Sequence, residues 1–134
     1  MEQTTIFLQG QVPAQKNSKK VAFNGRTGKP FIMTEQRVKV WQESVAWQLS
    51  SIRPIFGKVE VEVEFTHKDR RKRDLDNELS SVMDALKNAK VIEDDNCDIV
   101  VKETAIFCGV DKDSPGAKIT ITPLTSQNAS AKLK

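Results

Sequence analysis

Two aspartates separated by one residue lie in the middle of the chain, and a third follows later. Asp74 and Asp76 come directly after a run of cations, and Asp95 comes nineteen residues after Asp76. Residues at alternate positions of an extended chain can point the same way, so the first two carboxylates can face one point. Carboxylates are hard ligands that suit Mg²⁺ or Mn²⁺, ions that also bind phosphate oxygens. We therefore expect the three aspartates to converge on a Mg²⁺ ion, with Mn²⁺ as the alternative.

A dense run of cations precedes these aspartates. The segment from Lys68 to Arg73 holds five cations and one anion, whereas the segment from Asp74 to Asp98 holds eight acidic residues and two lysines. Cations bind the phosphates of a polyanion, and carboxylates bind the divalent ion between them. We expect this run to contact the phosphates of a polyanion, together with an earlier basic block. The residues expected to bind it are Arg70, Arg71, Lys72, Arg73, Lys16, Lys19 and Lys20.

Simpler interpretations exist for both patterns. An isolated Asp-x-Asp pair most often caps a helix, because aspartate accepts hydrogen bonds from the first free N–H groups. A charge run is most often a solvated loop. A calcium-binding EF-hand loop starting at Asp74 is excluded, since Leu79 and Ala85 replace its required glycine and glutamate. His67 is the only histidine, which excludes a zinc site with several imidazoles.

The spacing of apolar residues predicts an α+β fold, with a mixed sheet and two main helices in a single small domain. The clearest strand covers residues 58–65, where valine and phenylalanine alternate with charged residues. A first helix is expected from a cap at Thr34 to Ile52 and a second from Asp76 to Lys90. Further strands are expected at 4–12, 98–107 and 118–122, and a hairpin with strands at 21–23 and 30–33. The domain should cover residues 1–124, followed by a disordered tail at 125–134.

Composition limits where the protein can act. The chain has 134 residues and a formal net charge of +3. It has no apolar run near the roughly 20 residues that a membrane helix needs, and no secretory signal is visible at its start. Cys97 and Cys108 lack metal-ligand spacing and are expected to be reduced thiols. These features indicate a cytoplasmic protein without a membrane partner.

The string from Asp69 to Asp95 resembles one known family. It reads Asp-Arg-Arg-Lys-Arg-Asp-Leu-Asp-Asn, then Met-Asp-Ala-Leu, then Val-Ile-Glu-Asp-Asp, and the earlier Pro-Ala-Gln-Lys-Asn at 13–17 fits as well. These motifs are similar to those of the RusA-type Holliday junction resolvases, which are common in bacteria and their prophages. The resemblance implies a Mg²⁺-dependent endonuclease of DNA recombination and repair that nicks two opposed strands of four-way junction DNA. It also implies that Asp74, Asp76 and Asp95 are the catalytic carboxylates.

The family resemblance further implies a homodimer, because a four-way junction presents two symmetric strands for cutting. For its interface we expect the first strand and the helix that carries Trp41 and Trp47. The chain departs from the family at Ser80, where a lysine is often found. Another cation, Lys16, Lys72 or Arg73, could take the place of that lysine. Otherwise the protein is a junction- or DNA-binding module that no longer cuts efficiently. A third possibility, a general flap or branched-DNA nuclease, has the same chemistry as the resolvase and differs only in its substrate.

Overall fold

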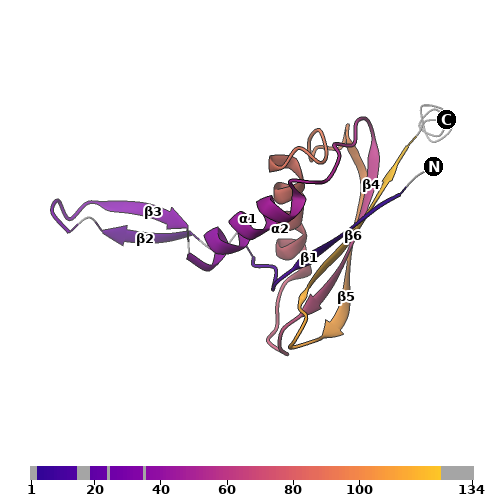
Figure 1. Cartoon of the computed structure of the whole chain (residues 1–134). Coiled ribbons are helices and arrows are strands. Elements are labelled where there is room, and N and C mark those ends of the chain that lie inside the picture. Colours follow the sequence, from indigo (N-terminus) through magenta and orange to yellow (C-terminus); the bar gives the residue numbers. More distant parts are fainter. Residues whose placement is uncertain (1–2, 15–18, 24, 35, 125–134) are drawn as a thin grey trace.

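The computed structural model describes residues 3–14, 19–23, 25–34 and 36–124 (Figure 1). A four-stranded sheet with the order β1-β6-β4-β5 carries both helices on one face, and a separate two-stranded sheet pairs β2 with β3. This arrangement confirms the expected α+β class. In chain order the elements are β1 (Thr4–Gln9), β2 (Lys19–Phe23), β3 (Pro30–Thr34), α1 (Gln36–Leu49), β4 (Val59–His67), α2 (Leu75–Asn88), β5 (Val100–Val110) and β6 (Gly116–Pro123).

Strand β4 lies inside the sheet and has a neighbour on each side. Its alternating sequence buries Val59, Val61, Val63 and Phe65 on the helix-covered face and turns three glutamates to the opposite face. It pairs antiparallel with β6 and parallel with β5. Both pairings are long, so β4 fixes the positions of its neighbours.

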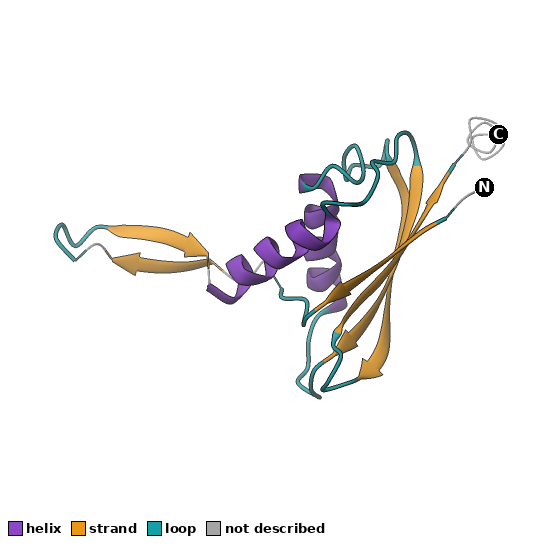
Figure 2. Cartoon of the chain, viewed as in Figure 1, coloured by secondary structure: helices purple, strands orange, loops and turns teal. Residues whose placement is uncertain are grey.

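The two helices cover the same face of the sheet (Figure 2). Helix α1 buries residues at steps of three and four, namely Val38, Trp41, Val45 and Leu49. Helix α2 connects β4 to β5 and buries Leu79, Val82, Met83 and Leu86. Trp41, Val45 and Leu49 of α1 and the four residues of α2 form one hydrophobic core with the inner faces of β1, β4 and β6.

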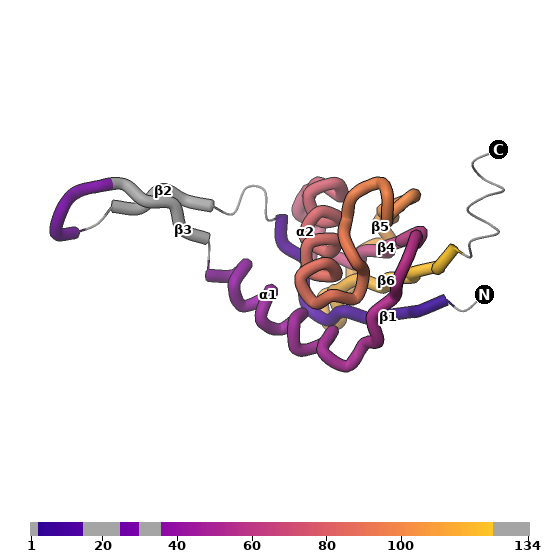
Figure 3. The backbone as a smooth tube through the Cα atoms, turned by 90° about the horizontal axis from the view of Figure 1, so that it is seen from above, coloured from indigo at the N-terminus to yellow at the C-terminus, as the bar shows by residue number. Residues whose placement is uncertain are grey.

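The expected hairpin is present and stands apart from the rest of the protein. Strands β2 and β3 pair antiparallel from Lys19 opposite Thr34 to Phe23 opposite Pro30. Figure 1 shows this hairpin projecting away from the sheet and helices. The helices and the four-stranded sheet lie together in the perpendicular view as well (Figure 3). The expected cap at Thr34 is wrong, because Thr34 belongs to β3 and α1 begins at Gln36.

Several expected boundaries shift by a few residues. Strand β1 ends at Gln9 because Gly10 has a φ of 101° and turns the chain out of the sheet. Helix α1 ends at Leu49 and is followed by a turn in which the Ile52 N–H donates to the Leu49 carbonyl. The expected tail at 125–134 lies outside the described residues. None of the helices in the described ranges has the length and apolar character to cross a membrane.

Gly116 allows the two strands β1 and β6 to approach closely. A Cβ atom at this position would overlap the Leu8 carbonyl oxygen. Gly116→Ala should therefore lower the free energy of unfolding by about 1–3 kcal/mol, the usual cost of forcing atoms into packed space. Urea denaturation measures this change, and Gly25→Ala, where a Cβ would meet nothing within 4 Å, is the control. Equal effects of the two substitutions would contradict the close approach.

Candidate functional site

The cationic run forms the loop between β4 and α2, and its one acidic residue organises it. Asp69 Oδ1 accepts hydrogen bonds from the Arg71 backbone N–H at 3.0 Å and from Arg73 Nη1 at 2.8 Å. The hydrogen bond from Arg73 holds the pKa of Asp69 below its usual value. Arg70, Arg71 and Lys72 remain exposed. Arg73 is half-buried and bonded within the loop, so of its four expected phosphate-binding residues only Arg70, Arg71 and Lys72 are exposed.

Asp74 and Asp76 lie together where this loop becomes helix α2. Asp74 is the N-cap of the helix, with its Oδ1 accepting from the Asp76 backbone N–H at 2.9 Å. Its carbonyl accepts from the Glu78 N–H at 3.1 Å. Both aspartates are exposed, whereas Leu75 between them packs against the core. The positive end of the helix favours both carboxylates at this position.

A buried pair of polar side chains lies beside the cationic loop, where β4 ends and α2 begins. His67 ends β4 and is 5% exposed, and Glu78 in the first turn of α2 is 1% exposed. The distance from His67 Nε2 to Glu78 Oε1 is 2.8 Å. Gln11 Nε2 donates to Glu78 Oε2 at 3.2 Å, while Gln11 Oε1 accepts from the Lys68 N–H at 2.8 Å. We call His67, Glu78 and Gln11 the polar brace, since they tie β4, α2 and the start of the cationic loop together.

Asp95 lies in the acidic turn that follows α2. Lys87 Nζ, in the last turn of the helix, is 3.5 Å from Asp94 Oδ1 and 3.7 Å from Asp95 Oδ1. The charges of Asp94 and Asp95 raise the pKa of Lys87. The pKa of Asp84 is also raised, first by its partial burial and then by the charge of Asp95. Asp95 therefore belongs to a carboxylate group at the C-terminal half of α2.

The expectation that all three aspartates converge within one chain is wrong. Asp74 follows the end of β4, whereas Asp95 precedes the start of β5, and these two strands are parallel. Helix α2 separates the two groups, because the thirteen residues from Asp74 to Lys87 rise by about 20 Å along its axis. Among the residues that the structure describes, no three His, Cys, Asp or Glu side chains gather closely enough to hold a metal ion.

Asp74 and Asp76 still fit a divalent cation of the Mg²⁺ type. Mg²⁺ is commonly bound through one or two carboxylates, with waters and phosphate oxygens completing its six positions. Two exposed carboxylates beside three exposed cations offer that combination once a nucleic acid supplies the phosphates. The donor set contains oxygen ligands only, which excludes a preference for soft metals.

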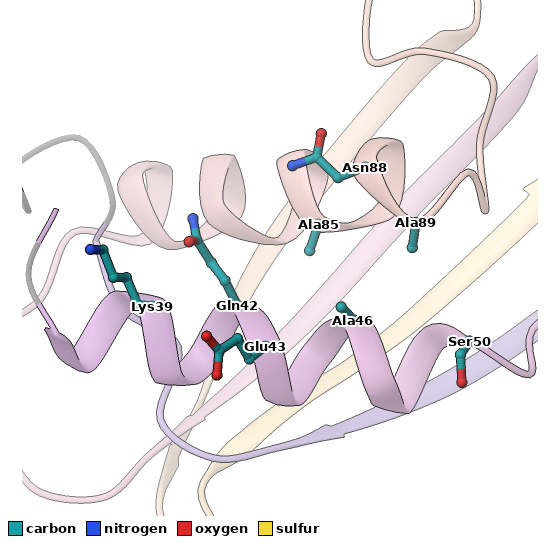
Figure 4. A pocket seen from close by; sticks show the side chains of 8 residues that line it. All are labelled: Lys39, Gln42, Glu43, Ala46, Ser50, Ala85, Asn88 and Ala89. Atoms are coloured by element: carbon teal, nitrogen blue, oxygen red, sulfur yellow. The ribbon is translucent and has the colours of Figure 1, made fainter.

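A groove runs between the two helices, away from the aspartate pair (Figure 4). Ala46 of α1 faces Ala85 and Ala89 of α2 across it, and polar side chains form its rim. The small side chains leave an open volume of about 590 Å³. Lys39 and Glu43 of α1 are charged residues of its lining, but no metal-ligand group forms there among the described residues, so we assign the groove no chemistry.

The fold and the site define a class of protein: a small α+β domain in which two exposed carboxylates, the donor type that Mg²⁺ prefers, lie beside an exposed cationic loop. The sequence matches the family model of Endodeoxyribonuclease RusA over residues 10–122. It is 30% identical over 129 residues to the Crossover junction endodeoxyribonuclease RusA of Aquifex aeolicus (strain VF5), an alignment that covers 94% of this chain and 96% of that protein. The chain belongs to the RusA family of endodeoxyribonucleases. The resemblance seen in the motifs is thereby confirmed.

Sequence reasoning missed the polar brace, although a signal for it was present. His67 continues the odd-numbered register of β4, in which residues 59, 61, 63 and 65 are buried. Glu78 lies next to Leu79 on the inner side of α2. Two polar residues at buried positions of neighbouring elements predict a pair, because each would be costly to bury alone. Of the other expected residues, Lys19 and Lys20 lie in β2, and Lys16 lies outside the described residues.

Glu78→Gln tests the brace through its pH dependence. Burial raises the pKa of Glu78 above 4.5, so the folded state holds this proton more tightly than the unfolded state does. The stability that this group contributes is complete below its unfolded pKa and is lost as the pH rises through the folded value. Urea denaturation from acid to neutral pH should therefore show wild type losing free energy of unfolding relative to Glu78→Gln. Glu103→Gln, at an exposed position of β5, is the matched control for the removal of one carboxylate charge.

Proposed function

We propose that the protein is a Mg²⁺-dependent endonuclease that resolves Holliday junctions by paired nicks in opposed strands, acting in the cytoplasm in DNA recombination and repair. Membership of the RusA family supports an endonuclease activity. The Aquifex relative is named as a crossover junction endodeoxyribonuclease, which supports a crossover junction as the substrate. The single observation that carries the proposal is the position of Asp74 and Asp76. Both are exposed at the start of α2, directly after the cations of the loop.

The residues of the loop and those of the helix terminus have different roles in the proposed reaction. Arg70, Arg71 and Lys72 bind phosphates of the DNA backbone, which brings one phosphodiester to the aspartates. Asp69 and Arg73 keep the loop in shape through their 2.8 Å hydrogen bond. The cap hydrogen bond fixes one Asp74 oxygen and orients the carboxylate. A bound Mg²⁺ would supply the positive charge and the activated water that phosphodiester hydrolysis requires.

We propose that a second copy of the chain completes each site. A two-fold axis that sets the α2 helices of two protomers antiparallel places the N-terminus of each beside the C-terminus of its partner. Asp95 of one protomer can then meet Asp74 and Asp76 of the other. The same rotation makes two equal sites, one for each strand to be cut. The outward face of α2 suits such an approach, because Asn77, Ser80 and Asp84 are short and half-buried.

The two tryptophans differ in exposure, and therefore in whether they can form the interface of such a dimer. Trp41 is 6% exposed and belongs to the core of its own protomer, so it cannot also form the interface. Trp47 is 80% exposed on α1 and remains a candidate. Phe7 of β1 is 68% exposed, but its neighbours Ile6 and Leu8 face the helix-covered core, so Phe7 lies on the opposite face of the sheet and outside an interface formed by α2. Large exposed apolar side chains are typical of surfaces that a partner covers.

Ser80 favours a second candidate function, a junction-binding module that cuts weakly. In a site shared by two protomers, Lys87 accompanies Asp95 and brings a cation close to the carboxylates. That arrangement supports the cutting enzyme over the binding module. A four-way junction, a flap and a duplex incubated with Mg²⁺ separate junction resolution from general cleavage of branched DNA.

Asp76→Asn should fold normally and bind a four-way junction, but its cleavage rate should fall by more than about 100-fold. Loss of a direct ligand should exceed the roughly 10- to 100-fold cost of altering residues behind the ligands. Binding should survive because Arg70, Arg71 and Lys72 are unchanged. Gel assays of binding and of nicking measure both effects, and Asp113→Asn in an exposed loop is the control. Cleavage at the wild-type rate by Asp76→Asn would exclude the role given to this residue.

Mixing two inactive variants tests whether the partner supplies Asp95. A heterodimer of Asp76→Asn and Asp95→Asn carries both substitutions in one shared site and none in the other. Free exchange of subunits should therefore restore about a quarter of the wild-type sites, because half of the dimers are mixed and each mixed dimer has one intact site. A mixture of Asp74→Asn with Asp76→Asn should restore nothing, since both residues belong to the same half-site. No recovery in the first mixture would mean that Asp95 does not act across the dimer.

A further inference from the structure

A pocket opens at the end of the sheet where α2 begins. It has a volume of about 450 Å³, within the range of about 300–1,000 Å³ typical of sites for small ligands. The cationic loop forms one wall, and an aromatic ring and a leucine form the rest. Its lining residues are His67, Asp69, Arg70, Arg71, Lys72, Arg73, Leu75 and Phe107.

Phe107 gives this pocket an exposed aromatic surface. It lies on β5 opposite Phe65 of β4 in the pairing register, and 50% of its surface is exposed. The centroids of its ring and of the His67 ring are 4.7 Å apart, at an interplanar angle of 40°. Because the hydrogen bond to Glu78 holds His67, the phenylalanine is backed by a fixed ring on one side. The structure therefore keeps an aromatic platform in place beside the cationic loop.

Charge and position together indicate what the pocket binds. An apolar patch alone would suit many partners, but this one adjoins Arg70, Arg71 and Lys72. A ligand with a flat aromatic face and a negative charge would complement both the aromatic wall and the cationic wall of this pocket. A nucleotide has these two features, in its base and its phosphate. Leu75 also lines the pocket, and it lies between Asp74 and Asp76. A nucleotide bound there would be next to the phosphodiester that lies at the aspartates in the proposed function.

We infer that this pocket binds one unstacked nucleotide of the DNA junction, with its base against Phe107 and its phosphate on the cations of the loop. The inference rests on the proposed function and extends it to substrate choice. Bases at the point of strand exchange lose stacking partners more easily than bases inside a duplex, where extrusion costs a few kcal/mol. A pocket for an unstacked base therefore favours junctions over duplexes, whereas phosphate contacts alone favour neither.

Phe107→Leu tests the inference by equilibrium binding in EDTA, where no strand is cut. Stacking on an aromatic side chain is worth about 1–3 kcal/mol per base, so affinity for a four-way junction should fall about 5-fold or more. Affinity for a duplex should not change, and the dependence of junction binding on salt should keep its slope because no charge is lost. Arg71→Ala should instead weaken binding to both DNAs and reduce the log–log salt slope by about 0.9. Phe107→Trp should retain the junction affinity.

Phe7→Leu is the matched control. Phe7 is also exposed and has a cation near its ring, since Lys118 Nζ lies 6.0 Å from the ring centroid. It differs from Phe107 in lying on β1, the opposite edge strand of the sheet. Unchanged junction affinity in Phe107→Leu would overturn the inference, as would equal weakening of duplex binding. Dissociation of a wild-type dimer by Phe107→Leu in sedimentation velocity would also overturn it, by showing that a second subunit covers this ring. Failure of the wild type to cut junctions would instead count against the proposed function.

Discussion

Strand β5 runs parallel to β4, and this pairing constrains the chain between them to return along the length of the sheet. Helix α2 makes that return, so the residues before it and after it emerge at opposite ends. One end carries Asp74 and Asp76 at the positive terminus of the helix, and the other carries Asp95 beside Lys87. The acidic residues are therefore divided into two groups, each stabilised by a different source of positive charge. This division follows from the topology and does not depend on the details of either loop.

The polar brace determines where the cationic loop leaves the sheet. A histidine and a glutamate buried separately would each cost several kcal/mol, whereas as a hydrogen-bonded pair they satisfy one another. Gln11 extends the brace to the chain that follows β1, and through its side-chain oxygen it also holds the first residue of the loop. The loop is thus attached at its start by Gln11, inside by Asp69, and at its end by the cap of α2. These attachments leave the backbone fixed and the three outer cations free to meet a ligand.

Local patterns in the sequence were sufficient to predict most of the helices and strands. The alternation in β4 and the spacing of three and four in both helices reflect burial on one side, which a strand or helix shows in its own sequence. The direction in which β5 pairs is different, because a strand has the same composition in a parallel or an antiparallel sheet. The place of Asp95 depends on that direction, so sequence alone could list the residue but not locate it. Asp74 caps α2 and still has an exposed side chain, so its role as a cap does not exclude a role as a metal ligand.

The hairpin formed by β2 and β3 extends the distance over which this small chain can touch another molecule. Five residues per strand at about 3.3 Å each add roughly 17 Å of reach beyond the helices and the sheet. A two-stranded hairpin with no third strand has little stability of its own in water. The projecting hairpin enlarges the molecular footprint without enlarging the hydrophobic core. A ligand that contacts both the hairpin and the sheet would therefore span a surface wider than the packed domain itself.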